Sequence, residues 1–116
     1  MVESLYPRDL TIRPLLRQRT VNATTGAWQI TEVAGRTDGY VWFSLTRDGA
    51  QISNALKVAL TNVTGTGYYQ ATIDGAVFAT ELSAVRDGTQ IWEVVQFGTE
   101  LPTVKPWRWR PTRPEA

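Results

Sequence analysis

Cysteine and histidine are both absent from this 116-residue chain. Without cysteine the chain can form no disulfide and offers no thiolate to a substrate or a metal ion. Without histidine it lacks the side chain that most often acts as a general base or a metal ligand near neutral pH. Only two lysines, Lys57 and Lys105, remain to activate a serine or threonine nucleophile. We therefore expect a protein that is not an enzyme and that holds no metal ion or other cofactor.

Carboxylates do not change that expectation. Four of the five aspartates stand directly before a glycine, where tight-turn geometry already explains them. Among the glutamates, Glu93 in the sequence IWEVV is the most notable, because an inward-facing carboxylate costs several kcal/mol unless it is paired. A solvent-facing position, or a pairing with an arginine, is the simpler interpretation of Glu93.

Long apolar runs are missing as well. No stretch approaches the ~20 apolar residues that a membrane-spanning helix needs, and the opening MVESLYPRD does not resemble the apolar core of a signal peptide. We expect a product that stays in the cytoplasm and has no membrane partner.

Turn signals divide the middle of the chain into short segments. The four Asp-Gly dipeptides recur between runs in which apolar and polar residues alternate. In YVWFSLTR, residues 40–47, one face carries Val41, Phe43 and Leu45, and the other carries Tyr40 and Trp42. Such alternation is typical of half-buried strands, and turns every ~8–12 residues are typical of a β-sandwich. The segments 9–19 and 27–33 could pair as a hairpin, with Pro14 at an edge or a break.

One segment departs from this pattern. In AVFATELSAVR, residues 76–86, the apolar residues Val77, Phe78, Leu82 and Val85 recur at helical spacing. Asp74 could cap the start of a helix and Gly88 its end. The sequence therefore predicts an all-β, small antiparallel sandwich with one short connecting helix.

Charge divides the chain into a body and two ends. Residues 1–19 hold four basic and two acidic residues, residues 20–104 hold four and eight, and residues 105–116 hold four and one. An acidic body with basic ends favours contacts of an end with a body, within one copy or between copies. We expect an N-terminal arm or edge strand over 1–19, a sandwich body over 20–104 and a C-terminal arm over 105–116.

The C-terminal arm contains KPWRWRPTRP, in which three prolines disfavour a helix. Tryptophan and arginine are enriched where proteins contact one another. We predict docking of the arms on a neighbouring copy or partner through Trp107, Arg108, Trp109 and Arg110, with Tyr6, Leu15 and Leu16 from the other arm. Packing of both tryptophans on the chain's own domain is the competing interpretation.

Two further functions compete with assembly. Tyr40 and Trp42 share a strand face and could form a patch on which a sugar ring stacks, so a carbohydrate-binding module with a glycan partner is the alternative. Stacking tryptophans beside arginines could also hold nucleic acid, the third candidate, although the acidic body would repel phosphate.

The stretch from VWFSLTRDGAQIS through LKVALTNVTGTGYYQATIDG to IWEVVQFG, about residues 41–98, resembles the immunoglobulin-like β-sandwich modules of tailed-bacteriophage virion proteins, such as the N-terminal domain of upper baseplate proteins. The shared layout is a strand, an Asp-Gly turn, a strand, the TGTGYY element, a short connecting segment and a closing strand. The resemblance implies an immunoglobulin-like fold and a structural or assembly component of a phage or phage-tail-like particle, in its tail, baseplate, neck or capsid-associated parts. Its partners would be other copies of itself or other virion proteins, and it would reside in the virion, assembled in the host cytoplasm.

Overall fold

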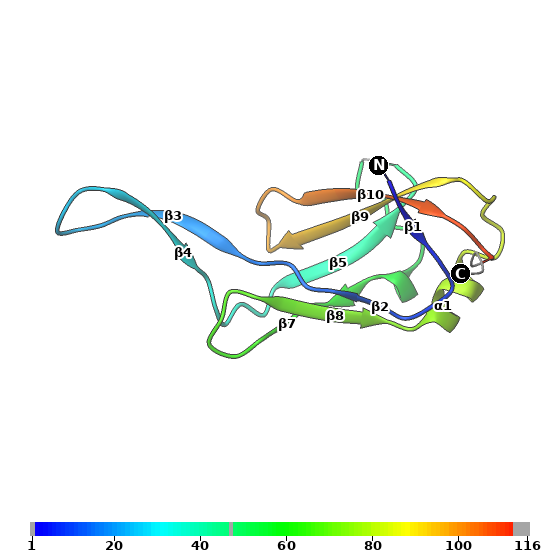
Figure 1. The fold of residues 1–116 in the computed structure, drawn as a ribbon, viewed down its shortest axis with the longest axis horizontal. Helices are drawn as coiled ribbons and strands as arrows, with labels where there is room; N and C mark the ends of the chain where they lie inside the picture. The colour runs from blue at the N-terminus through cyan, green and yellow to red at the C-terminus, as the bar shows by residue number, and fades with distance from the viewer. Residues whose placement is uncertain (1, 47, 113–116) are drawn as a thin grey trace.

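The computed structural model describes residues 2–46 and 48–112. Two β-sheets face each other in a sandwich-like body, and a two-stranded hairpin projects from one end (Figure 1). The five-stranded sheet has the order β1 (Glu3–Leu5), β10 (Thr103–Trp109), β9 (Gln90–Phe97), β5 (Gly39–Ser44) and β6 (Val58–Ala59). The three-stranded sheet has the order β2 (Leu10–Ile12), β8 (Tyr69–Ile73) and β7 (Thr61–Asn62). The hairpin consists of β3 (Arg17–Val21) and β4 (Trp28–Glu32).

The all-β prediction is confirmed, and the alternation in β5 shows why. Val41 and Phe43 are fully buried between the sheets, whereas Tyr40 on the opposite face is exposed. Leu45, which was predicted to share the buried face, is exposed because β5 ends at Ser44. β9 lies between β5 and β10 in the middle of its sheet, and apolar side chains are buried on both of its faces: Val95 is 7% exposed on one and Val94 is 2% exposed on the other.

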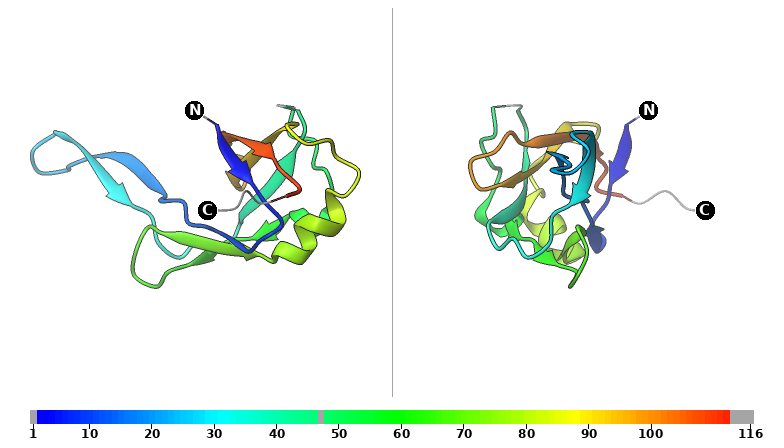
Figure 2. Two further views of the ribbon diagram at one scale, coloured as in Figure 1. Left: turned by 45° about the vertical axis from the view of Figure 1, so that its right-hand side comes forward. Right: turned by 90° about the vertical axis from the view of Figure 1, so that its left-hand side faces the viewer.

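The predicted helix is present and shorter than expected. α1 (Gly75–Glu81) begins after Asp74, whose carboxylate accepts a hydrogen bond from the Ala76 amide at 2.7 Å. Phe78 is fully buried and meets Phe43 edge to face, with ring centroids 5.5 Å apart. The helix and a single-turn 3-10 helix, η1 (Asn54–Leu56), pack against each other. α1 lies at the end of the body opposite the hairpin (Figures 1 and 2).

The C-terminal segment is a strand of the body, which corrects the prediction of an extended arm over 105–116. β10 pairs antiparallel with β9, and its last three residues pair parallel with β1. Alternate residues of β10 therefore point into the core, where Trp107 is 5% and Trp109 is 1% exposed. Pro106 has a partner strand on one side only: it pairs with β9, whereas β1 pairs only with Trp107 to Trp109. Proline is tolerated at such an edge position of a sheet. Residues 113–116 of the predicted arm lie outside the described residues.

The N-terminal segment also belongs largely to the body. β1 is the edge strand that the sequence allowed, and its Leu5 is 2% exposed in the core. β2 forms the edge of the other sheet. The Asp9 carboxylate accepts a hydrogen bond from the Gly75 amide at 2.8 Å, which ties the connection between these strands to the start of α1.

The hairpin is the part that leaves the body. The predicted pairing of 9–19 with 27–33 is confirmed only in part: the ladder joins Arg17–Val21 to Trp28–Glu32. The first half of the predicted segment forms β2 instead and pairs with β8. The described chain measures 56 × 30 × 26 Å, with a radius of gyration of 16.5 Å. A compact domain of this length would have a radius of about 13 Å. The excess reflects the hairpin, which extends from the body with no other element beside its tip (Figure 1).

Candidate protein-interaction site

The hairpin has two chemically different faces. Its ladder places Arg19 opposite Ile30 and Val21 opposite Trp28, so these four side chains share one face with Arg17. The other face is polar and carries the cross-strand pairs Gln18–Thr31 and Thr20–Gln29. Glu32, opposite Arg17, lies on the first side as well, but its carboxylate is bonded to the Gly67 amide at the base. We call Arg17, Arg19, Val21, Trp28 and Ile30 the hairpin face.

The apolar residues of the hairpin face are open to solvent. Trp28 is 63%, Ile30 64% and Val21 52% exposed. The Arg19 guanidinium lies over the Trp28 ring, 4.7 Å from its centroid, a contact that contributes about 0.5–1 kcal/mol at an exposed site. An isolated two-stranded hairpin is marginally stable in water, so this cation–π contact helps to keep the face in order without covering it.

The base of the hairpin is fixed to the body on both strands. The Leu16 amide donates to the Gly67 carbonyl at 2.7 Å, and the Gly67 amide donates to the Glu32 carboxylate at 2.8 Å. The Val33 amide donates to the Leu16 carbonyl at 3.0 Å, and the Val33 carbonyl accepts from the Tyr69 hydroxyl at 2.8 Å. These bonds set the direction of the hairpin before any partner arrives, which lowers the entropy lost on binding.

A groove of about 350 Å³ opens between the two sheets beside the base of the hairpin. Apolar side chains form most of its walls, and carboxylates stand at its floor and rim. Leu101, in the β9–β10 connection, is 95% exposed at this rim. We call this the inter-sheet groove; it is lined by Pro14, Leu15, Leu16, Glu93, Val95, Phe97, Glu100, Leu101, Thr103 and Lys105.

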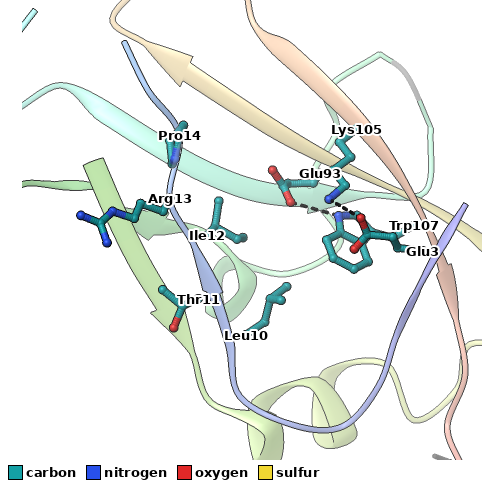
Figure 3. Close-up of a pocket in the computed structure, with 9 residues that line it drawn as sticks. All are labelled: Glu3, Leu10, Thr11, Ile12, Arg13, Pro14, Glu93, Lys105 and Trp107. Carbon is teal, nitrogen blue, oxygen red and sulfur yellow. Dashed lines mark hydrogen bonds and ion pairs between the residues drawn. The ribbon is translucent and has the colours of Figure 1, made fainter. Parts of the chain in front are cut away.

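Glu93 stands between the inter-sheet groove and a second hollow next to it (Figure 3). Its carboxylate faces inward, is 8% exposed, and accepts a hydrogen bond from the Trp107 indole at 3.0 Å. Lys105 pairs with Glu3 at 3.2 Å close by. Burial raises the pKa of Glu93, and the Trp107 hydrogen bond and the Lys105 charge offset only part of this rise. The pairing is thus with an indole rather than with the expected arginine.

Replacing Glu93 with glutamine is expected to stabilise the domain increasingly as the pH rises. The folded state holds the Glu93 proton more tightly than the unfolded chain, so the wild type loses stability from the unfolded pKa up through the raised folded pKa. Glutamine has no proton to lose and keeps an oxygen for the Trp107 indole. Each unit of the rise corresponds to about 1.4 kcal/mol. Urea unfolding from about pH 4 to about pH 8 measures the effect; a stability difference that does not change with pH would contradict a raised pKa.

The residues predicted for arm docking are spread over different environments. Trp107 and Trp109 fill the core, so they cannot dock on a neighbour while the body is folded, and this prediction is corrected. Arg108 is exposed on the opposite side of β10, and Arg110 stands 3.9 Å from Asp87. Tyr6 is partly buried beneath Arg8. Leu15 and Leu16 are the two predicted residues that line the inter-sheet groove.

The hairpin face was not predicted as a contact site. Its signal in the sequence was that Trp28 and Ile30 alternate with polar residues, whereas the arginines Arg17 and Arg19 alternate along the partner strand, where Arg19 lies opposite Ile30. With only Val21, Trp28 and Ile30 on this side, and Arg19 opposite Ile30, the strand pair is too small to form an apolar core of its own. That combination indicates a two-stranded ribbon whose apolar side chains are covered by a surface outside the hairpin.

The predicted aromatic patch lies on the outer face of β5. Tyr40 is exposed, and Trp42 is partly buried and donates from its indole to the Gly49 carbonyl at 2.9 Å. The Lys57 ammonium lies over both rings, 5.0 Å from the Tyr40 centroid and 5.8 Å from that of Trp42. A charged group therefore occupies the side on which a sugar ring would stack, and the arrangement gives the glycan alternative no support.

The structure describes residues 2–46 and 48–112. Within these residues no helix is both long and apolar enough to cross a bilayer, and no three acidic side chains gather as metal ligands. No protein-family model, curated protein or solved structure matches the chain.

Proposed function

We propose that this protein is a structural subunit of a phage or phage-tail-like particle and that it assembles with other copies or other virion proteins through the hairpin face. The observation that carries the proposal is the exposure of Trp28 and Ile30 on an arm held in a fixed direction. Contiguous exposed apolar surface marks interaction sites on monomers. Tryptophan and arginine are the residue types that dominate binding energy at such sites.

The strand order supports an immunoglobulin-like assignment. The series β10-β9-β5-β6 matches the G-F-C-C′ order of immunoglobulin sheets, and β2-β8-β7 matches B-E-D. In this correspondence the hairpin occupies the B–C connection, and residues 98–102 form the F–G connection. Variable domains bind through loops of this same end. The comparison is one of fold alone and carries no partner.

The virion setting comes from the resemblance of residues 41–98 to phage β-sandwich modules. Charge is compatible with assembly, because residues 17–32 hold two arginines and one glutamate, whereas residues 33–104 hold four basic and seven acidic residues. Electrostatic attraction would steer a basic hairpin toward an acidic body, and repulsion would keep two basic hairpins apart. Nucleic acid is disfavoured as a partner by the same acidic body.

Substituting serine for both Trp28 and Ile30 is expected to abolish assembly and leave the body folded. Both side chains stand outside the core, so the free energy of unfolding should fall by no more than about 1 kcal/mol, most of it from the lost Arg19–Trp28 contact. Light scattering behind size exclusion, over a series of protein concentrations, measures the mass of the wild type and of the variant. The matched control replaces Gln18 and Gln29, on the polar face of the hairpin, with serine.

The expected result is an oligomer for the wild type and for the polar-face control, and a folded monomer for Trp28→Ser/Ile30→Ser. A variant that keeps the wild-type mass would contradict assembly through the hairpin face. A wild type that remains monomeric at every concentration would contradict self-assembly of the chain.

A further inference from the structure

We infer that the hairpin face of one copy binds in the inter-sheet groove of a second copy of this chain, an inference that rests on the proposed function and names its partner. The structure shows that a copy does not fill its own groove with its own hairpin. Trp28 and Ile30 remain more than half exposed, and the groove remains open. Both surfaces are therefore available for another molecule.

The apolar chemistry of the two surfaces matches. Leu16, Val95 and Phe97 line the groove; Val95 and Phe97 are already largely buried, so most of the open apolar area belongs to Leu16 and to Leu101, which is almost fully exposed at the rim. Trp28 and Ile30 are the large apolar side chains that such a channel could bury. Contact between the two surfaces would remove apolar area on each of them from water. Each Å² so buried stabilises the complex by about 25 cal/mol.

The charges are complementary as well. Arg36 is shared by two carboxylates, at 2.7 Å from Asp38 and 2.6 Å from Glu100, so this end of the groove carries an excess negative charge. Glu93 adds a carboxylate to the lining, and the one cation among the lining residues, Lys105, is paired with Glu3 at 3.2 Å. Arg19, held beside Trp28, would enter next to these groups. An arriving guanidinium favours the ionised form of a nearby carboxylate.

The positions of the two surfaces allow both to be used at once. Leu16 lines the groove, and its carbonyl accepts a hydrogen bond from the Val33 amide at the base of the hairpin, so the groove lies next to that base. Five residues of β3 span about 17 Å from that base. Two copies with facing hairpin ends could therefore place each hairpin alongside the groove of the other, as a two-fold contact requires.

Directed thiol–disulfide exchange tests the contact in the full chain. Because the chain has no cysteine, a Val21→Cys variant carries one thiol on the hairpin face, beside an intact Trp28 and Ile30. That thiol is first converted to a mixed disulfide with thionitrobenzoate. A Thr103→Cys variant carries a thiol at the groove. Its thiolate attacks the sulfur at position 21, the new disulfide joins the two chains, and thionitrobenzoate leaves as a coloured thiolate.

The control variant is Gln29→Cys, activated in the same way, which displays its thiol on the polar face of the hairpin. We expect the Val21→Cys and Thr103→Cys pair to release thionitrobenzoate at least about tenfold faster than the Gln29→Cys and Thr103→Cys pair, because a disulfide forms only when the two Cα atoms come within about 7 Å. The linked dimer is confirmed by mass.

Equal rates for the two pairs would overturn the inference. If Trp28→Ser/Ile30→Ser still becomes monomeric in that case, the proposed function stands and only the groove is the wrong partner. If that variant instead keeps the wild-type mass, the hairpin face itself is not the assembly surface, and the proposed function fails with the inference.

Discussion

A chain that ends at Val104 is expected to lose its cooperative unfolding transition. The deletion removes Trp107 and Trp109 from the core, together with the strand that joins β1 to β9. Replacing one buried tryptophan with alanine costs about 3–5 kcal/mol, and the whole stability of a small domain is about 5–15 kcal/mol. The loss of both side chains and of two ladders therefore exceeds what the remaining body can supply.

Circular dichroism and tryptophan fluorescence during urea titration measure this result. A chain that ends at Thr112 is the control, because it keeps every contact described for β10. In the full chain, Trp109→Ala should cost about 3–5 kcal/mol, whereas Arg108→Ala, on the exposed side of the same strand, should cost no more than about 0.5 kcal/mol. If the truncated chain stays folded, β10 is not needed for the core, and its tryptophans would again be candidates for docking on a partner.

Replacing Gly75 with alanine is expected to destabilise the domain, although alanine usually favours a helix. A methyl group at this position would lie 2.3 Å from the Arg8 Cα and 2.6 Å from its carbonyl carbon. These are backbone atoms, so the chain before β2 or the start of α1 must move. Such movement also strains the hydrogen bond from the Gly75 amide to Asp9. Overpacking of this kind costs about 1–3 kcal/mol or more.

Chemical denaturation of Gly75→Ala measures the sign of the effect. The matched variant is Ala79→Gly, at an exposed position of the same helix, which reports helix propensity alone and should cost about 1 kcal/mol. If propensity governed both sites, Gly75→Ala would gain stability where Ala79→Gly loses it. An increase in stability for Gly75→Ala would therefore show that the Arg8 backbone yields easily.

Features set by neighbours along the chain were predictable from the sequence. The alternation of Val41 and Phe43 requires only the period of a strand, and the Asp74 cap of α1 requires only a side chain within reach of the next turn. The close approach of Arg8 to Gly75 was not predictable in this way. It depends on a contact between residues that are far apart in the sequence.

The burial of Trp107 and Trp109 illustrates the same limit. Tryptophans that alternate with arginines describe an extended segment with one apolar side, whichever surface covers that side. The covering surface is the chain's own core, and β1, which borders these residues in the sheet, comes from the opposite end of the sequence. The hairpin shows the converse. Its pairing is local and was predicted in part, but its projection from the body follows from the absence of any described element of the body against Trp28 and Ile30, which the sequence does not show.

The parallel pairing of β1 with β10 also imposes an order on biosynthesis. During translation β1 emerges early and must wait for β10, so the five-stranded sheet cannot close until Trp109 has left the ribosome. The β3–β4 hairpin joins neighbouring segments and can form long before that. A nascent chain therefore displays its Trp28 and Ile30 arm while its own groove, which needs β9 and β10, does not yet exist. If the groove is the binding site for the hairpin, only chains that have already folded β9 and β10 can bind the hairpin of another copy. Assembly would then select folded chains.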